Sequence, residues 1–323
     1  MKKERVNEAQ LIALIKRTVK ERGHLKVGIG DDACVLSDGK TVFTTDAYAQ
    51  GVHFDLRYMD YFEIGSRCAC ACLSDVVAMG AEPLVLLVSL CLPKETKFSK
   101  IKSLYQGMEK VCRKLGGEIG GGDIIASDRL VLSLSALGRT DKPLLRCGAR
   151  PGDFVYLTGY AGLAETGRIL LAQKRRSLCS ISGAKEAIAR HLFPLPRIEV
   201  MRQLKGQMGA LIDTSDGLAT DARHIAEMSN VRIIIHPEKI PMHKATVKIC
   251  QLIDKNPFRF CLTAGEDYEL LFTTKEKMPS RIANIPVSVI GRVERGRGLY
   301  YEEKGVIRAI KEHGYDHLDQ KTG

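Results

Sequence analysis

The chain has 323 residues, 45% of them hydrophobic and 27% charged, a composition typical of a globular protein with more than one domain. Its net charge of +11 indicates an anionic partner. Because the basic residues are scattered and the densest run, residues 174–176, has no aromatic residue between its charges, no nucleic-acid partner is expected.

The N-terminal part begins with charged residues and has no apolar stretch behind them, so no signal peptide is expected. Asn7 and Gln10 form the pattern of a capping box, and helical spacing of apolar residues follows up to Gly23. The longest apolar run, residues 84–92, has the length of a strand and is far too short to cross a membrane.

Alternating strand and helix patterns continue through both halves of the chain, which predicts a mixed α and β fold. Short strands that end in polar turns are predicted over residues 27–32 and 42–46. Helices are predicted over residues 61–79, 98–115, 162–172 and 216–228, and strands over residues 84–92, 130–137, 154–158, 211–213, 231–235, 260–263, 269–273 and 287–290.

A turn-rich stretch, residues 146–153, lies near the middle of the chain and predicts a domain boundary there. We therefore expect an N-terminal domain over residues 1–148 and a C-terminal domain over residues 149–323.

Ten cysteines without a secretory signal and without a CxxC pair indicate reduced thiols and a cytoplasmic protein. Cys68, Cys70 and Cys72 lie at alternate positions of a predicted helix, a spacing that scatters them around its axis. We interpret them as small buried side chains and not as metal ligands.

Six short segments place a carboxylate directly after Gly, Ser or Thr, and most follow an apolar stretch. They are Gly30-Asp31-Asp32, Thr44-Thr45-Asp46, Ser74-Asp75, Gly121-Gly122-Asp123, Asp213-Thr214-Ser215-Asp216 and Gly265-Glu266-Asp267. Mg²⁺ prefers oxygen ligands and commonly combines one or two carboxylates with phosphate oxygens and water. Small neighbouring residues let the backbone approach a polyphosphate. Together the segments favour a metal-polyphosphate site on short turns.

Each segment taken alone has a simpler interpretation. Asp and Ser are common helix N-caps, and Gly-Asp pairs are common in turns. The chain contains neither the P-loop pattern GxxxxGK[ST] nor the HRD and DFG patterns of protein kinases. A nucleotide would therefore be held mainly through metal ions and a glycine-rich backbone.

Seven motifs occur in order along the chain: GIGDDACVL, TTDAYAQGVHFD, LSDVVAMGAEPL, GGDI, RCGARPGD, IDTSDGLATDARHIA and AGEDYELLFT. This ordered set closely resembles the motifs of the thiamine-monophosphate kinase family, and the resemblance covers the chain from about Gly28 to Tyr315. The resemblance implies a two-domain architecture like that of aminoimidazole ribonucleotide synthetase, with a sheet and helices in each domain. It implies an ATP- and Mg²⁺-binding N-terminal domain that also forms a homodimer, and a C-terminal domain that completes the nucleotide and substrate site.

The same resemblance implies an enzyme of thiamine diphosphate biosynthesis that transfers phosphate from ATP to thiamine monophosphate with several Mg²⁺ ions. No catalytic base is expected, since the acceptor is an ionised phosphate monoester. By motif, the implied metal ligands are Asp31, Thr44, Thr45, Asp46, Asp75, Asp123, Asp213 and Asp216. The implied ATP-binding residues are Tyr105, Gly121, Gly122, Arg146 and Ser215, and the implied substrate-binding residues are His53, Glu266 and Tyr315.

Two alternatives remain at this point. A related ATP-using enzyme, similar to aminoimidazole ribonucleotide synthetase or selenophosphate synthetase, would share the same turns. A non-catalytic nucleotide or nucleic-acid binder would account for the charge of +11 and would release no ADP.

Overall fold

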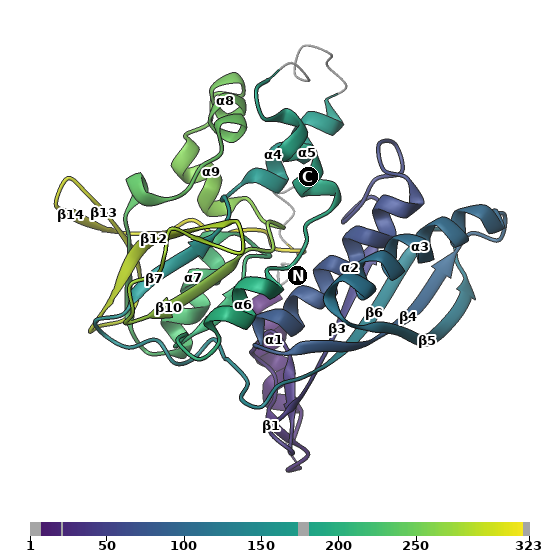
Figure 1. Ribbon diagram of the computed structural model, residues 1–323, viewed down its shortest axis with the longest axis horizontal. Coiled ribbons are helices and arrows are strands. Elements are labelled where there is room, and N and C mark those ends of the chain that lie inside the picture. Colours follow the sequence, from purple (N-terminus) through teal and green to yellow (C-terminus); the bar gives the residue numbers. More distant parts are fainter. Residues whose placement is uncertain (1–7, 21, 174–180, 319–323) are drawn as a thin grey trace, which may run out of the picture.

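Two sheets, each packed with helices, make up the computed structural model, which describes residues 8–20, 22–173 and 181–318 (Figure 1). This arrangement confirms the predicted mixed α and β class. The predicted cap residue Asn7 and the basic run at residues 174–176 lie outside the described residues.

The first sheet has six strands in the order β1-β2-β3-β6-β4-β5. Their bounds are β1 Leu25–Val27, β2 Cys34–Leu36, β3 Thr41–Ala49, β4 Glu82–Leu92, β5 Glu118–Ala126 and β6 Val131–Arg139. All neighbouring strands are antiparallel except β4 and β5, which are parallel. Two helices, α2 (Tyr61–Ala78) and α3 (Phe98–Leu115), pack together and cover one face of this sheet (Figure 1).

Helix α2 is fixed at its start by a capping box, in which the Asp60 side chain accepts from the Glu63 N–H and the Glu63 side chain accepts from the Asp60 N–H, both at 2.8 Å. Its contact with α3 is very close. A Cβ on Gly65 would lie 2.0 Å from the Leu104 carbonyl oxygen, and a Cβ on Gly107 would lie 2.1 Å from that of Phe62. Glycine at these two positions therefore lets the two helices approach.

The second sheet has the strand order β14-β13-β9-β12-β7-β10-β8, with β11 paired to β12. Its strands are β7 Phe154–Thr158, β8 Leu211–Asp213, β9 Arg232–Ile235, β10 Leu270–Thr274, β11 Arg281–Ile282, β12 Ile285–Glu294, β13 Gly298–Glu303 and β14 Val306–Ala309. The helices of this half are α4 Leu163–Ala172, α5 Ala184–Leu192, α6 Ile198–Leu204, α7 Leu218–Met228, the 3₁₀ helix η2 Pro237–Lys239, α8 Lys244–Leu252 and α9 Pro257–Thr263.

Helix α2 is shared between the two sheets. One continuous hydrophobic core extends from Leu134 of β6, through Leu73 of α2, to Phe272 of β10. A second core lies among the helices of the C-terminal half and includes Leu271 and Ile225. The three cysteines of α2 are all buried in the first core, as their interpretation as small buried side chains predicts: Cys68, Cys70 and Cys72.

One strand prediction is wrong. Residues 260–263 belong to helix α9, which begins with Pro257 after the N-cap Asn256, whose side chain accepts from the Arg259 N–H at 3.0 Å. Short apolar runs do not distinguish a strand from a buried helix, and the cap and the proline are helix signals. Helices α5, α6 and α8 were not predicted.

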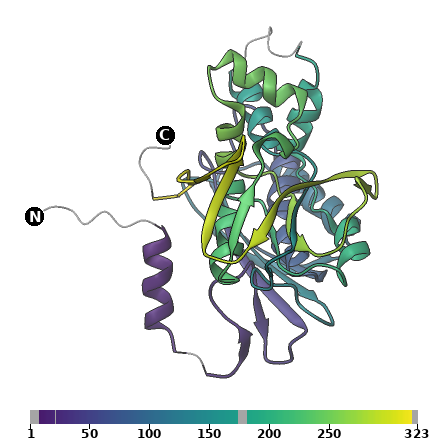
Figure 2. The same cartoon turned by 90° about the vertical axis from the view of Figure 1, so that its left-hand side faces the viewer.

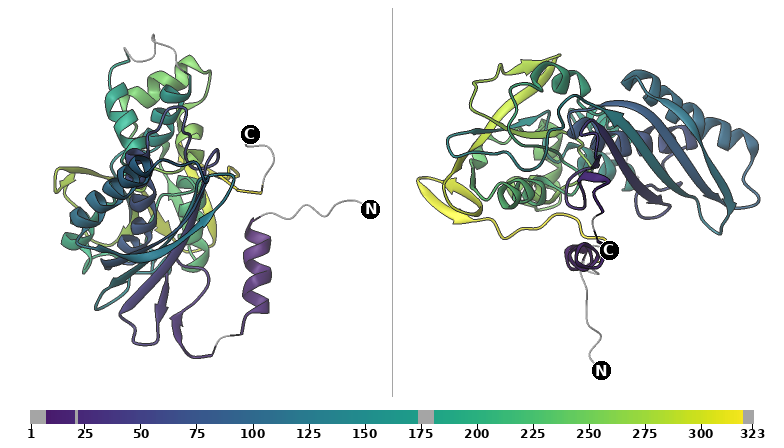
Figure 3. Two further views of the ribbon diagram at one scale, coloured as in Figure 1. Left: turned by 90° about the vertical axis from the view of Figure 1, so that its right-hand side faces the viewer. Right: turned by 90° about the horizontal axis from the view of Figure 1, so that it is seen from below.

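The N-terminal helix α1 (Glu8–Thr18) has no buried residue and stands apart from the body of the molecule (Figure 2). At the other end of the chain, the segment after β14 runs back across the molecule toward α1 (Figure 3). We call residues 310–318 the C-terminal strap.

Candidate active site

Four acidic side chains from both sheets lie close enough to interact electrostatically, and we call them the acidic cluster: Asp32, Asp46, Asp75 and Asp213. Asp46 lies within β3, Asp75 within α2 and Asp213 at the end of β8. Asp32 follows the short strand β1. Since α2 packs against both sheets, it brings carboxylates from distant parts of the sequence together.

The cluster is poor in compensating charge. Burial, followed by the charge of neighbouring Asp32, raises the pKa of Asp213 to about 8. Burial, followed by the charges of Asp46 and Asp213, raises the pKa of Asp75 well above its usual range. A buried carboxylate whose pKa rises in this way lacks sufficient cations or hydrogen-bond donors around it.

Hydroxyl groups hold one oxygen of each of three cluster carboxylates. Tyr48 donates to Oδ2 of Asp46 at 2.7 Å. Thr44 donates to Oδ2 of Asp75 at 2.8 Å. The third such hydroxyl belongs to Ser74, which donates to Oδ2 of Asp213 at 2.5 Å. These contacts fix the orientation of the carboxylates. Thr44 was implied as a metal ligand, and in the structure its hydroxyl donates to Asp75.

Arg146 is the cation beside the cluster. Its Nη2 lies 2.6 Å from Oδ1 of Asp32, and its backbone N–H donates to Asp31 at 3.2 Å. The other oxygen of Asp32, Oδ2, is buried and has no hydrogen-bond partner among the described residues. Burial, followed by the charge of Asp32, raises the pKa of Asp31 to about 6.

Asp216 lies on the loop between β8 and α7, next to Ser215. Burial raises its pKa to about 6, and the charge of Glu8 in α1 contributes. Behind it, the buried Asp221 side chain accepts from the Gly217 N–H at 3.1 Å and interacts electrostatically with both Asp216 and Asp213. Asp216 therefore lies close to the Asp213 end of the acidic cluster.

The remaining implied metal and ATP residues of the first sheet lie elsewhere. The Thr45 hydroxyl points away from Thr44, accepts from the Ser135 hydroxyl at 3.0 Å and donates to the Leu134 carbonyl. Asp123 lies on the edge strand β5, three strands from Asp46 or roughly 14 Å at the usual strand spacing. Gly121 and Gly122 precede it on β5, and Tyr105 lies on α3. Within a single chain, these residues therefore lie away from the acidic cluster.

Three of the six segments that the metal-site interpretation placed on short turns lie within regular elements, as the helix predicted over residues 61–79 already implied for Ser74-Asp75. Thr44-Thr45-Asp46 is in the middle of β3, Ser74-Asp75 is in α2, and Gly121-Gly122-Asp123 is in β5. β-Branched threonine favours a strand, and the capped α2 continues through Ser74 to Ala78. Gly122 has a φ of +156°, and a Cβ there would lie 1.8 Å from the Val88 carbonyl oxygen. That glycine therefore serves close pairing of β5 with β4.

The three implied substrate-binding residues are connected through two further side chains. The buried Arg67 of α2 forms an ion pair with Glu266 (2.6 Å) and donates from Nε to the His53 carbonyl at 3.4 Å. The His317 ring lies 5.0 Å from the His53 ring and 4.8 Å from the Tyr315 ring, centroid to centroid. His53 is therefore linked to Glu266 and Tyr315, although it lies more than 200 residues before either of them in the sequence.

The C-terminal strap brings Tyr315 and His317 to this place. Arg223 of α7 donates to the carbonyl oxygens of Ile310 and Glu312, at 3.1 and 2.9 Å. The Gly314 N–H donates to the Thr220 hydroxyl at 2.8 Å, and the Tyr315 N–H donates to the Asp216 carbonyl at 2.9 Å. The strap is thus attached by polar contacts along α7 and its preceding loop.

Comparison with known proteins decides the family. Residues 30–140 match the family described as "AIR synthase related protein, N-terminal domain". The chain is 34% identical to thiamine-monophosphate kinase of Aquifex aeolicus, with 95% of this chain and 97% of the relative covered, and 31% identical to that of Bacillus subtilis, with 97% and 100% covered. The chain belongs to the thiamine-monophosphate kinase family.

Solved structures of the thiamine-monophosphate kinase family agree with this assignment. A structure described as AaThiL complexed with AMPPCP and TMP has a TM-score of 0.86 at 33% identity and covers 98% of this chain, with 99% of that chain matched. The hydrogenase maturation protein HypE, at 18–20% identity, shares the fold. The chain is accordingly a phosphotransferase with the fold predicted from its motifs.

The carboxylate oxygens of the acidic cluster suit Mg²⁺, but few side chains are available to hold each ion. Oδ2 of Asp32 is buried without a partner, and the cluster carboxylates have raised pKa values that a hard cation would lower. Among the described residues, however, no three His, Cys, Asp or Glu side chains stand close enough to hold one ion. Each ion would therefore need phosphate oxygens and water beside one or two carboxylates.

Sequence reasoning did not assign several residues that the structure places at the site: Asp32, Arg67, Asp221 and His317. Asp32 belongs to the same Gly-Asp-Asp motif as Asp31, and His317 lies two residues after Tyr315. Arg67 is the one basic residue in the helix YFEIGSRCACACLSDVVA. A single arginine among small buried residues could have indicated a buried cation with a specific partner.

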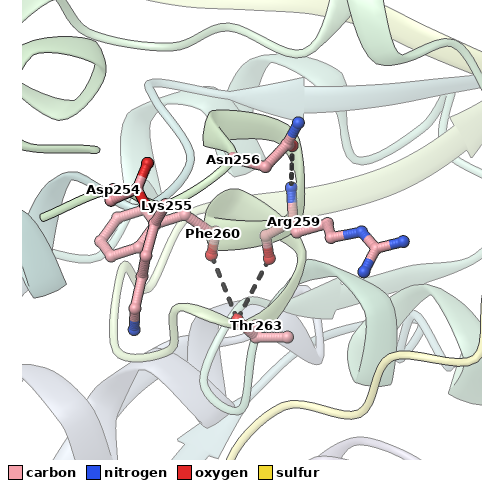
Figure 4. Close-up of a pocket in the computed structure, with 6 residues that line it drawn as sticks. All are labelled: Asp254, Lys255, Asn256, Arg259, Phe260 and Thr263. Carbon is pink, nitrogen blue, oxygen red and sulfur yellow. Dashed lines mark hydrogen bonds between the residues drawn. The ribbon is translucent and has the colours of Figure 1, made fainter. Parts of the chain in front are cut away.

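A pocket of about 340 Å³ beside α9 contains none of the implied site residues. Its hydrogen bonds are those of the α9 N-cap at Asn256 and of the Thr263 hydroxyl at the helix end (Figure 4). It is lined by Asp254, Lys255, Asn256, Arg259, Phe260 and Thr263. Within the described part of the chain, no helix is long and apolar enough to cross a membrane.

Proposed function

We propose that this protein phosphorylates thiamine monophosphate to thiamine diphosphate with ATP as the phosphate donor. The observation that carries the proposal is the acidic cluster, in which buried and half-buried carboxylates from both sheets lie together with raised pKa values. Membership of the thiamine-monophosphate kinase family and the AaThiL complex with AMPPCP and TMP support the choice of both substrates.

Several Mg²⁺ ions are proposed at and around the cluster. Bound Mg²⁺ would neutralise the phosphate oxygens and reduce repulsion between two polyanions. The residues proposed to hold the ions are Asp31, Thr44, Thr45, Asp46, Asp75, Asp123, Asp213 and Asp216, to which the buried Asp32 is now added. In this arrangement the hydroxyls of Tyr48 and Ser74 orient Asp46 and Asp213.

Direct in-line transfer without a phosphoenzyme is proposed. The acceptor is a phosphate monoester whose second pKa is about 6, so it is ionised near neutral pH and needs no general base. The chain's contribution is then to bind and orient both substrates. Arg146 and Ser215 lie beside the cluster and are proposed to contact ATP, together with Tyr105, Gly121 and Gly122.

The acceptor is proposed to bind at His53, Glu266 and Tyr315. Burial lowers the pKa of His53, so its imidazole is neutral near pH 7. Because Nδ1 accepts from the Ala49 N–H, Nε2 carries the proton and can donate a hydrogen bond. Glu266 supplies a negative charge that is partly exposed, and Tyr315 supplies an aromatic ring. Such a set suits a cationic, nitrogen-containing ring.

A homodimer formed by the first sheet is also proposed. The sheet face opposite α2 and α3 exposes Phe43 and Leu87, and exposed apolar patches commonly mark protein interfaces. Asp123 and Thr45 lie on the same face by strand register. A second copy that covers this face would bring further residues toward each site. The mass in solution, measured by light scattering, tests this proposal.

We further propose that the two sheets correspond to domains over residues 1–148 and 149–323, and that the protein is cytoplasmic. All cysteines of the described part of the chain are free thiols, which supports a reducing compartment.

The decisive experiment is a product assay. The purified protein is incubated with ATP, Mg²⁺ and thiamine monophosphate, and thiamine diphosphate and ADP are quantified by chromatography. Equal amounts of both products, dependent on the acceptor, are expected. ADP release without thiamine diphosphate, or no turnover with fresh Mg²⁺, would contradict the proposed function.

A further inference from the structure

Arg67 is a buried side chain that contacts three separate segments. Its Nη2 forms an ion pair with Oε2 of Glu266 at 2.6 Å, and its Nε donates to the His53 carbonyl at 3.4 Å. Its Nη1 donates to the carbonyl of His191, the penultimate residue of α5. Only 3% of the Arg67 side chain is exposed, against 33% of that of Glu266.

The loop that carries Glu266 has an unusual backbone. Glu266 has a φ of +63° and Tyr268 a φ of +48°, in the left-handed region that residues other than glycine rarely adopt. The Glu266 N–H donates to the Ser215 carbonyl at 2.7 Å, and the side chain is held by Arg67. Strain of this kind persists only where the surroundings fix the backbone, and it is common at binding sites.

His53 is held from the other direction. Its Nδ1 accepts from the Ala49 N–H at 3.1 Å, and its ring packs against Tyr48 and His317. Arg67 contacts its backbone carbonyl, behind the imidazole. The guanidinium therefore supports both His53 and Glu266 from the protein interior.

We infer that Arg67 is a positioning residue that fixes His53 and Glu266 in the arrangement needed to bind the acceptor. This inference rests on the proposed function, because it assumes that these two residues face thiamine monophosphate. Arg67 is buried behind them, so the acceptor contacts the residues that Arg67 holds and not the guanidinium.

The chemistry requires arginine at this position. The planar guanidinium presents five N–H donors in a fixed geometry, which allows it to contact two carbonyl oxygens and one carboxylate at once. A lysine keeps the charge but concentrates it on one nitrogen. It would satisfy Glu266 and release the carbonyls of His53 and His191.

Two variants test the role of Arg67. For Arg67→Lys, we expect the KM for thiamine monophosphate to rise about tenfold, the loss typical of one charge-assisted hydrogen bond, with the KM for ATP changed less than twofold. For Arg67→Met, the KM for the acceptor should rise further. The double variant Arg67→Met/Glu266→Gln should recover part of the thermal stability lost in Arg67→Met, because the Glu266 carboxylate left without its partner is removed. Its acceptor KM should stay high, since both the proposed contact of Glu266 and the support of His53 are then absent.

Arg202→Met is the matched control. Arg202 of α6 pairs with Glu82 of β4 at 2.5 Å, so it also joins the two halves of the molecule, but it is partly exposed and touches no site residue. We expect both KM values of this variant to stay within twofold of those of the parent protein.

The outcomes separate the inference from the proposed function. No thiamine diphosphate from the unmodified protein contradicts the proposed function itself. If the unmodified protein is active and Arg67→Lys keeps the parental acceptor KM, or raises the KM values for ATP and acceptor equally, the positioning role is wrong. Should Arg67→Met fail to fold, Arg67→Lys decides the question alone.

Discussion

Ser74 donates a hydrogen bond of 2.5 Å to Oδ2 of Asp213, and this contact joins helix α2 of the first sheet to strand β8 of the second. Both side chains are buried. The bond lowers the pKa of Asp213, although burial has the larger, opposite effect. One hydroxyl thus links the two halves at the place where their acidic side chains meet.

Ser74→Ala is expected to weaken both the fold and the binding of divalent cations. Loss of a hydrogen bond to a buried carboxylate costs about 2 kcal/mol in unfolding free energy. It also frees the Asp213 carboxylate to change orientation. Urea unfolding with and without Mg²⁺, and direct titration with Mn²⁺, measure the two effects.

Ser66→Ala is the control for this change. Ser66 also lies in α2, is equally buried, and donates to the Gly107 carbonyl at 3.2 Å, away from the acidic cluster. It should lose stability without losing cation affinity. If both variants lose cation affinity to the same extent, the Ser74–Asp213 contact has no particular role in metal binding.

Asp75→Asn should depress phosphate transfer strongly. Asp75 lies half-buried among other carboxylates and is held by Thr44, so an amide in its place keeps the shape but removes the charge. We expect kcat to fall about 100-fold, in line with the removal of one preorganised electrostatic contact, and excess Mg²⁺ to restore only part of it. Steady-state kinetics over a range of Mg²⁺ concentrations measure this.

For comparison, Asp141→Asn removes a charge from an exposed carboxylate that pairs with Lys40 at 3.7 Å. Activity of that variant should be unchanged. Full activity of Asp75→Asn at limiting Mg²⁺ would show that Asp75 is not a ligand.

Stability of the metal-free protein should fall as the pH rises. The pKa of Asp213 is raised by burial from 3.8 to about 8, and that of Asp75 is raised well above 3.8. Stability from such groups is fully present below pH 4 and is lost as the pH rises through the folded-state pKa. Burial lowers the pKa of His191 to about 2, and a lowered pKa of this kind makes the stability rise with pH. That rise ends above the unfolded-state pKa of His191, about 6.5.

The test therefore compares pH 6.5 with pH 8.5. With EDTA, the Tm should be lower at pH 8.5. Mg²⁺ at about 100 times its Kd adds about 2.7 kcal/mol, or about 5 °C in Tm for a chain of this size, with the larger effect at pH 8.5. Sodium chloride at equal ionic strength is the control. A Tm that responds equally to both salts at both pH values would argue against metal binding at the cluster.

Much of the fold follows from local patterns in the sequence. Helix α2 has a capping box at Asp60 and Glu63 and ends before Gly80, and β7 has the predicted bounds. These elements carry their own start and stop signals. The run at residues 260–263 did not, because four apolar residues fit either a strand or a short helix.

The site was less accessible from the sequence, because its residues meet through packing. The helix that carries Asp75 was predicted, but the sequence does not show that this helix packs between two sheets and brings the carboxylate to Asp46 and Asp213. Arg67 carries no motif of its own. Its role depends on contacts with His53, 14 residues before it, and with Glu266 in the distant C-terminal half, and no local pattern encodes them.

The C-terminal strap gives a last prediction, which concerns Gly314. A Cβ at this position would lie 1.9 Å from the Asp216 carbonyl oxygen and 3.1 Å from the Thr220 hydroxyl. Gly314→Ala should therefore displace the strap and move Tyr315 and His317 away from His53. The strap is held mainly by polar contacts and its side chains are largely exposed, so the Tm should fall by no more than about 2 °C.

Because Tyr315 is proposed to line the acceptor site, we expect Gly314→Ala to raise the KM for thiamine monophosphate about tenfold, a loss of about 1.4 kcal/mol of binding, and to change the KM for ATP less than twofold. Gly206→Ala is the matched control, since an added Cβ there meets no atom within 4 Å. It should behave like the parent protein in both assays. An equal rise in both KM values for Gly314→Ala would instead mean that the strap acts through Asp216 and the nucleotide side of the site, because the Asp216 carbonyl accepts from the strap at Tyr315.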